Sequence, residues 1–116
     1  MRLSTGLHLP FHSLVGAVLW LCPAVGFSQK SAEKQPDMVA IRSMAFQPAT
    51  LTVHRGDTII WSNSDIYTHN VVSGQGTISS PDIETGKTWR FVARRTGTFA
   101  YHCVFHPNMR GTLIVR

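Results

Sequence analysis

The sequence from Met38 onward predicts an all-β domain, either a sandwich or a barrel. Short runs of β-branched and aromatic residues recur along it, and turn residues separate them. No stretch after Asp37 sustains the 3.6-residue apolar period of an amphipathic helix. Residues 38–116 are enough for one domain, near the size at which a single hydrophobic core becomes marginal.

Six strands are expected in this region. The first alternates from Val39 to Met44 and is broken at Phe46-Gln47-Pro48. The others are expected at residues 51–54, 58–63, 88–93, 98–103 and 111–115. Glycine-containing turns separate them, around residues 55–57, 73–76, 84–87 and 96–97.

The first residues of the chain have the pattern of a cleavable signal peptide. Arg2 is the only charge before Lys30, and an apolar run over residues 14–21 lies between them. The whole apolar stretch, about 12 residues, is shorter than the roughly 20 needed to span a bilayer. Small residues follow it, as they follow the apolar part of a secretory signal. We therefore expect cleavage after Gly26 or after Ser28.

This interpretation divides the chain into a signal peptide at residues 1–28, a flexible polar linker at 29–37 and a domain at 38–116. The mature protein would be periplasmic or otherwise exported, without a membrane span. An uncleaved N-terminal anchor is the alternative. Lipid attachment at Cys22 is a weaker one, because bulky Trp20 and Leu21 precede it where small residues are usual.

Charge and composition exclude some classes of function. Lys and Arg exceed Asp and Glu, for a formal net charge of +5. The basic residues are scattered apart from Arg94-Arg95, no aromatic residues interleave with a basic cluster, and no nucleic-acid motif is present. We therefore expect no nucleic-acid partner and interpret the charge as a bias toward acidic proteins.

Export gives Cys103 an unusual position, because removal of residues 1–28 leaves it as the single cysteine. Small secreted domains normally use cysteines in pairs, as disulfides. A lone thiol in an oxidising compartment is a liability unless something occupies it. A metal ion is one such occupant, and simple burial is the alternative.

Cys103 opens the most informative segment, Cys103-Val104-Phe105-His106-Pro107-Asn108-Met109. It offers a thiolate, an imidazole and a thioether at spacings of three residues. Soft sulfur combined with imidazole suits copper, and two histidines, one cysteine and a distant methionine form a blue-copper centre. Zinc accepts the same nitrogen and thiolate donors, but a thioether has little purpose for zinc.

A second imidazole must come from elsewhere in the chain. His54 lies beside a Gly-Asp turn, where an exposed polar side chain is normal. His102 adjoins Cys103 in a strand, so its side chain points to the opposite face of the sheet. By elimination, His69 is the expected second ligand, at a strand start after the loop at residues 63–68.

These segments resemble the cupredoxins, and among them the amicyanin- and plastocyanin-like branch. The resemblance covers residues 38–116 and is carried by Thr68-His69-Asn70-Val71-Val72 and by the segment from Tyr101 to Gly111, with weaker matches at residues 46–48 and 53–58. It implies a Greek-key β-sandwich that holds one type 1 copper ion, cycling between Cu(I) and Cu(II), near one end. It also implies that His69, Cys103 and His106 are equatorial ligands and that Met109 is axial.

This sequence departs from the family pattern at one position, and the resemblance also gives an expectation about docking. Asn70 occupies the place of an asparagine that usually pairs with a Ser or Thr hydroxyl just after the cysteine, but here that residue is Val104. A tie between the two loops must therefore use backbone groups or another side chain. The His106 edge is expected to reach the surface through an apolar patch, with Phe105, Pro107 and Met109 at its rim.

The sequence therefore predicts a monomeric one-electron carrier whose redox donor and acceptor dock near His106, with a bias toward acidic partners. A periplasmic copper carrier or chaperone without a dedicated redox partner is the alternative. We expect no enzyme, because no nucleophile-and-base constellation stands apart from the copper motif and no His-x-His pair is present.

Overall fold

The computed structural model describes residues 6, 8–13, 15–29 and 31–116 and forms two compact units, Met1–Ser31 and Ala32–Arg116. In the first unit the described residues have no regular secondary structure. The predicted signal peptide lies partly outside the described residues, and its bounds, like those of the linker and the domain, stay predictions. Among the described residues, none belongs to a helix that is long and apolar enough to cross a membrane.

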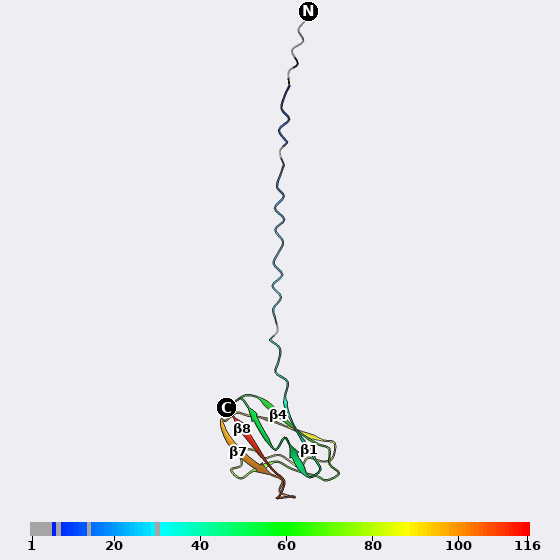
Figure 1. Ribbon diagram of the computed structural model, residues 1–116, viewed down its shortest axis with the longest axis vertical. Coiled ribbons are helices and arrows are strands. Elements are labelled where there is room, and N and C mark those ends of the chain that lie inside the picture. The colour runs from blue at the N-terminus through cyan, green and yellow to red at the C-terminus, as the bar shows by residue number, and fades with distance from the viewer. Residues whose placement is uncertain (1–5, 7, 14, 30) are drawn as a thin grey trace, which may run out of the picture. The chain divides into compact units, whose positions relative to one another are not determined.

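The second unit is a sandwich of two four-stranded sheets, which confirms the predicted all-β class (Figure 1). One sheet has the strand order β2-β1-β4-β6 and the other β3-β8-β7-β5. The strands are β1 (Asp37–Arg42), β2 (Ala45–Gln47), β3 (Thr50–Val53), β4 (Thr58–Asn63), β5 (Val72–Ser73), β6 (Thr88–Val92), β7 (Gly97–His102) and β8 (Arg110–Val115).

Alternating side chains of the strands fill the space between the sheets. In β4, Ile59, Trp61 and Asn63 are buried and their neighbours are less so, the two-residue period of a strand with one covered face. β8 repeats the pattern, with Leu113 and Val115 facing inward. The Trp61 ring meets the Tyr101 ring edge-on, with centroids 5.6 Å apart, so the two sheets share one core.

The β1–β2 connection differs from the sequence-based expectation. The alternating run was expected to continue to Met44, but β1 ends at Arg42, and Ser43 and Met44 form a two-residue hairpin turn. Both turn residues have left-handed backbone angles, with φ of 52° and 58°. Such a turn favours Asn-Gly, so a Ser-Met pair gives no hairpin signal. The residues expected to break the strand, Phe46 and Gln47, instead lie in β2.

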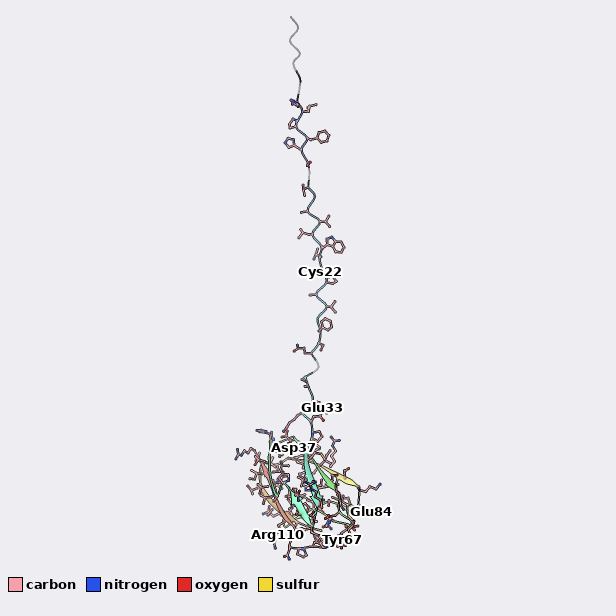
Figure 2. The ribbon with its side chains drawn as sticks, turned by 45° about the vertical axis from the view of Figure 1, so that its right-hand side comes forward. Cys22, Glu33, Asp37, Tyr67, Glu84 and Arg110 are labelled. Atoms are coloured by element: carbon pink, nitrogen blue, oxygen red, sulfur yellow. The ribbon has the colours of Figure 1, made fainter. Side chains whose placement is uncertain are left out.

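Strand direction gathers the segments of interest at one end of the sandwich, here called the site end. β1 and β4 run in parallel and finish together, with Ile41 beside Asn63. The connection that follows β4 and the loop that follows β7 both lie there. Figure 2 shows Tyr67, Glu84 and Arg110 at this end, and Asp37 at the opposite, distal end.

Candidate metal centre

The loop between β7 and β8 brings three of the expected ligands into one short turn. Cys103 directly follows β7, and Met109 directly precedes β8. The Cys103 amide donates to the Met109 carbonyl at 3.1 Å, and the Met109 amide donates to the His106 carbonyl at 2.8 Å. Because these bonds close the loop, Cys103 and Met109 are buried while His106 stays partly exposed.

His69 comes from a different segment and is fixed by its backbone. Its amide donates to the Ile83 carbonyl at 3.1 Å, and the Ile83 amide donates back at 2.7 Å. This two-bond bridge holds the β4–β5 connection against the segment that leads to β6. The His69 side chain is fully buried, so both ring nitrogens need partners within the protein.

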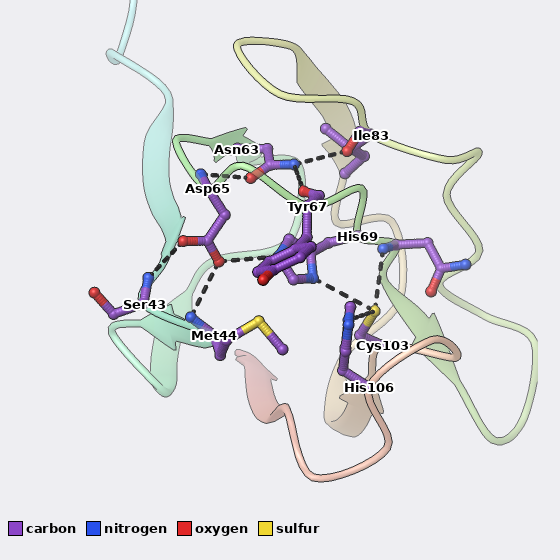
Figure 3. A network of polar contacts seen from close by, with 10 residues as sticks. Ser43, Met44, Asn63, Asp65, Tyr67, His69, Ile83, Cys103 and His106 are labelled. Carbon is purple, nitrogen blue, oxygen red and sulfur yellow. Dashed lines mark hydrogen bonds and ion pairs between the residues drawn. The ribbon is translucent and has the colours of Figure 1, made fainter.

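The two histidines and the cysteine converge on one point (Figure 3). Nδ1 of His69 and Nδ1 of His106 each lie 3.7 Å from Sγ of Cys103. All three donor atoms lie within 4.8 Å of one another. Donors bound to one first-row ion at about 2.0–2.3 Å stand roughly 3.5–4 Å apart in a trigonal plane. The observed spacing therefore fits a single metal ion.

Met109, the fourth expected donor, is buried. Its side chain is 3% exposed and belongs to the core cluster that also contains Cys103. Two imidazoles, one thiolate and a neighbouring thioether are the donors of a blue-copper centre. Although Met109 is little exposed, it lines the shallow depression beside His106 together with Phe105 and Pro107, as the sequence led us to expect.

Asp65 is a functional neighbour that the sequence did not reveal. Its Oδ2 lies 2.9 Å from Nε2 of His69, the nitrogen that faces away from Cys103. The same carboxylate accepts hydrogen bonds from the amides of Ser43, at 2.7 Å, and Met44, at 3.0 Å. Partial burial alone raises the pKa of Asp65, but the Met44 and Ser43 amides and the His69 ring outweigh it and hold that pKa below its usual value.

Asn63 holds the segments that carry Asp65 and His69 in place. Its side-chain amide donates to the carbonyls of Tyr67 and Ile83, each at 2.8 Å, and its Oδ1 accepts from the Asp65 amide at 2.9 Å. Asn63 is fully buried. One side chain therefore joins both segments that position His69. In the sequence it indicated only a loop, because nothing local marks its distant partners.

Asn70 joins the His69 segment to the Cys103 loop through backbone groups. The Val104 amide donates to Oδ1 of Asn70 at 2.8 Å. The Asn70 amide in turn lies 3.5 Å from Sγ of Cys103, within reach of a weak hydrogen bond to sulfur. The sequence analysis expected the link between the two loops to use a backbone group or another side chain, because Val104 has no hydroxyl. The donor is the main-chain amide of Val104.

The two remaining histidines of the domain lie away from the three donors. His54 is 82% exposed in the β3–β4 turn at the distal end. His102 pairs with Arg110 across β7 and β8 and faces outward, beside the buried Cys103. Both placements agree with the sequence-based expectation.

Apolar side chains surround the exposed edge of His106. Phe105 and Val104 are each about half exposed, and Tyr67 is 53% exposed, with its ring centroid 6.1 Å from that of His106. Met44, 40% exposed, lines a shallow depression with Phe105, His106 and Pro107. The expected apolar patch is therefore present, and Met44, Tyr67 and Val104 extend it beyond the Cys103 loop.

Comparison with known proteins agrees with this geometry. The family model described as "Cupredoxin-like domain" matches residues 13–115. The chain belongs to the cupredoxin family. Family membership, together with the three converging donors, confirms the predicted fold and the expected cofactor, one type 1 copper ion.

Among curated proteins, this cupredoxin is 32% identical over 83 residues to the amicyanin of Paracoccus denitrificans, covering 67% of this chain and 63% of that protein. It therefore spans less than two thirds of that relative's length. It is 28% identical over 115 residues to the plastocyanin of Synechococcus sp. strain JA-2-3B'a(2-13), covering 79% and 82% of the two chains.

Solved structures give the same picture. An amicyanin variant in its oxidised state matches with a TM-score of 0.65 and 30% identity, covering 70% of this chain and 82% of the other. A copper-containing nitrite reductase from Thermus scotoductus matches with a TM-score of 0.68 at 24% identity, over 72% of this chain and 23% of that enzyme. That second likeness concerns the fold alone.

Proposed function

We propose that this cupredoxin is an exported one-electron carrier whose copper ion would be held by His69, Cys103 and His106, with Met109 as the fourth donor. The observation that carries the proposal is the placement of the two Nδ1 atoms, each 3.7 Å from the Cys103 sulfur. Copper, when bound, supplies the Cu(I)/Cu(II) couple.

The protein's contribution is to hold its donors in place. Cys103 and Met109 are anchored at the ends of two paired strands, and His69 by its backbone bridge to Ile83. Donors that are fixed in this way rearrange little when one electron arrives or leaves, which lowers the barrier to transfer. The Asn70 amide, 3.5 Å from Sγ, can donate a weak hydrogen bond to the sulfur and so helps to hold it in place.

The partly exposed His106 edge supports docking of a redox donor and acceptor at this surface. Electrons would pass through the imidazole, since Cys103 and His69 are fully buried. Phe105, Val104 and Tyr67 give the surrounding surface its apolar character, and exposed apolar patches mark interaction sites. We therefore propose that a protein partner contacts this patch directly.

The charges at the site end would do little to steer a partner toward His106. Within Ala32–Arg116, the site end carries three cationic and three anionic side chains, namely Arg42, Lys87, Arg110, Asp65, Asp82 and Glu84. The excess positive charge lies along β6 and at the distal end, where Arg55, Arg94 and Arg95 stand. An acidic partner, if attracted by net charge, would thus find no surplus of cations around His106.

The copper-carrier alternative receives less support. A protein that passes metal on needs a site from which the ion leaves easily. Here Cys103 and His69 are fully buried, and the loops that carry them are tied together by the bond between Val104 and Asn70. Among the described residues, the one group with metal-binding potential is that of His69, Cys103 and His106, which the electron-carrier proposal already uses.

The decisive experiment is the visible spectrum of the copper-loaded protein and of Cys103→Ala. We expect an intense thiolate-to-copper band that the substitution abolishes, together with reversible one-electron cycling. His102→Ala is the matched control, because His102 adjoins Cys103 but faces outward, and it should keep the band. Absence of the band from the unchanged protein would refute the proposal. Rapid metal transfer to an apo-acceptor without reversible redox would favour the carrier.

Export is part of the proposal and has its own test. Mass spectrometry of the protein purified from cells should show a chain that begins at Phe27 or Gln29. A chain that keeps its apolar N-terminal run and fractionates with membranes would instead support the anchor.

A further inference from the structure

The buried His69 ring needs a partner on the side away from the metal donors. Its Nδ1 faces Sγ of Cys103, and its Nε2 lies in the protein interior. The partner is the carboxylate of Asp65, 2.9 Å from Nε2 and only 13% exposed. An ionised carboxylate can only accept, so Nε2 carries the hydrogen and Nδ1 keeps its lone pair.

Asp65 is itself held by the β1–β2 turn. Oδ1 accepts from the Ser43 amide, and Oδ2 from the Met44 amide as well as from His69. The turn lies more than twenty residues upstream in the sequence. One carboxylate therefore connects a hairpin in the first sheet to a metal-facing imidazole, as Figure 3 shows.

The backbone of that turn gives independent support. Ser43 and Met44 both adopt left-handed angles, with φ of 52° and 58°. This conformation costs roughly 1–2 kcal/mol for each L-residue that is not glycine. Such strain persists only where surrounding contacts determine it. Here the contacts are the two amides that this conformation turns toward the Asp65 carboxylate.

We propose that Asp65 is the positioning residue of the copper centre: its carboxylate sets the hydrogen-bonding form and the orientation of His69 and fastens the β1–β2 turn to it. The redox consequences rest on the proposed copper function, but the imidazole geometry does not. A partner of this kind typically changes metal affinity 10–100-fold. Its negative charge also favours Cu(II) over Cu(I).

The experiment compares Asp65→Ala, Asp65→Asn and Asp65→Glu with Asp57→Asn in the purified protein. Asp57 is the matched control, because its carboxylate also accepts from a turn amide, that of His54 at 2.8 Å, but stands at the distal end. The readouts are exchange of the His69 ring N–H proton in the copper-free protein by NMR, the copper dissociation constant and the reduction potential.

For Asp65→Ala we expect at least tenfold faster exchange of that proton and 10–100-fold weaker copper binding. Asp65→Asn should shift the redox equilibrium toward Cu(I) at least tenfold, about 59 mV upward. Asp65→Glu should restore part of the copper affinity and part of the reduction potential. Asp57→Asn should leave the proton exchange rate, the copper affinity and the potential unchanged. If Asp65→Ala does not fold, Asp65→Asn decides by the same readouts.

Two results would overturn the proposal. One is a His69 ring-proton exchange rate in Asp65→Ala that equals the rate in the control, Asp57→Asn. If Asp65→Ala does not fold, the same comparison is made with Asp65→Asn. The other is a potential in Asp65→Asn that stays within the range of the control. Failure of the proposed function is distinguishable, because it appears as a missing thiolate band in the unchanged protein while the proton measurement on copper-free protein still reports on Asp65.

Discussion

The Val104 amide donates to Oδ1 of Asn70 at 2.8 Å, across two loops that lie 34 residues apart in the sequence. This bond fixes the Cys103 loop against the His69 segment with a main-chain donor. The side chain of residue 104 is therefore free to be apolar, and it is 53% exposed at the surface beside His106. Residue 104 therefore has two roles: its amide links the two ligand loops, and its side chain is part of the apolar docking surface.

Replacement of Asn70 by Ala should loosen the two loops. The Val104 amide loses its acceptor, which should lower the free energy of unfolding of the copper-free protein by about 1 kcal/mol and speed copper release. Chemical denaturation and transfer of copper to a chelator measure the two effects. Val104→Thr is the control, since it keeps the amide and changes the side chain alone. A larger loss of stability from Val104→Thr than from Asn70→Ala would contradict the assignment.

Gly111→Ala should destabilise the domain near its metal loop. Gly111 faces Tyr101 across β7 and β8, and a Cβ there would overlap the buried phenol ring. Overpacking of this kind costs about 1–3 kcal/mol, and Tyr101 lies two residues before Cys103. Thermal unfolding measures the loss. Gly74→Ala, where a Cβ meets nothing within 4 Å, should stay within about 0.5 kcal/mol of the parent.

A better turn sequence should stabilise the β1–β2 hairpin. Ser43→Asn combined with Met44→Gly supplies the residues that favour two consecutive left-handed conformations. We expect the free energy of unfolding to rise by about 1 kcal/mol, with the thiolate band unchanged because both amides that reach Asp65 remain. Gln75→Asn, beside the left-handed Gly76, is the control: Gln75 itself has no left-handed angle, so this change should stay within about 0.5 kcal/mol of the parent. A fall in the midpoint of thermal unfolding would show that the turn is not strained.

Stability in acid should depend on Asp57. The hydrogen bonds that it accepts from Lys34 and from the His54 amide hold the pKa of Asp57 below its usual value. As pH falls, Asp57 therefore takes up its proton at a higher pH in the unfolded state than in the folded state. The Asp57 carboxylate contributes fully to the free energy of unfolding above about pH 4, and this contribution is lost as pH falls through the folded-state pKa. Asp57→Asn should reduce the decrease in unfolding free energy between about pH 5 and pH 2. Parallel curves for the two proteins would refute the coupling.

The parts of the site that the sequence predicts are those with local signals. Cys103, His106 and Met109 lie within one short segment whose spacing and chemistry favour copper. His69 could be reached by elimination, because His102 must face the other side of its strand. Strand alternation likewise predicted β4 and β8 closely, at residues 58–63 and 111–115.

The rest depends on partners that are distant in the chain. Asp65 stands in a polar loop where an aspartate is ordinary, and its contacts with Ser43 and Met44 form only after the sheets assemble. The donor to Asn70 is a backbone amide, which every residue except proline has, so the identity of Val104 could not reveal it. The Ser43–Met44 turn was missed because its conformation is held by tertiary contacts and not by turn-forming residues.

The uneven distribution of charge has a consequence for the molecule as a whole. Charge is balanced around His106, whereas β6 and the distal end together carry six cationic side chains against three anionic ones, so the positive side of the domain lies away from the redox edge. On a negatively charged electrode it would settle with its cationic end down and its redox edge turned away. On an uncharged apolar monolayer the patch around His106 would face the surface. Voltammetry should therefore be fast on the second kind of electrode and slow on the first.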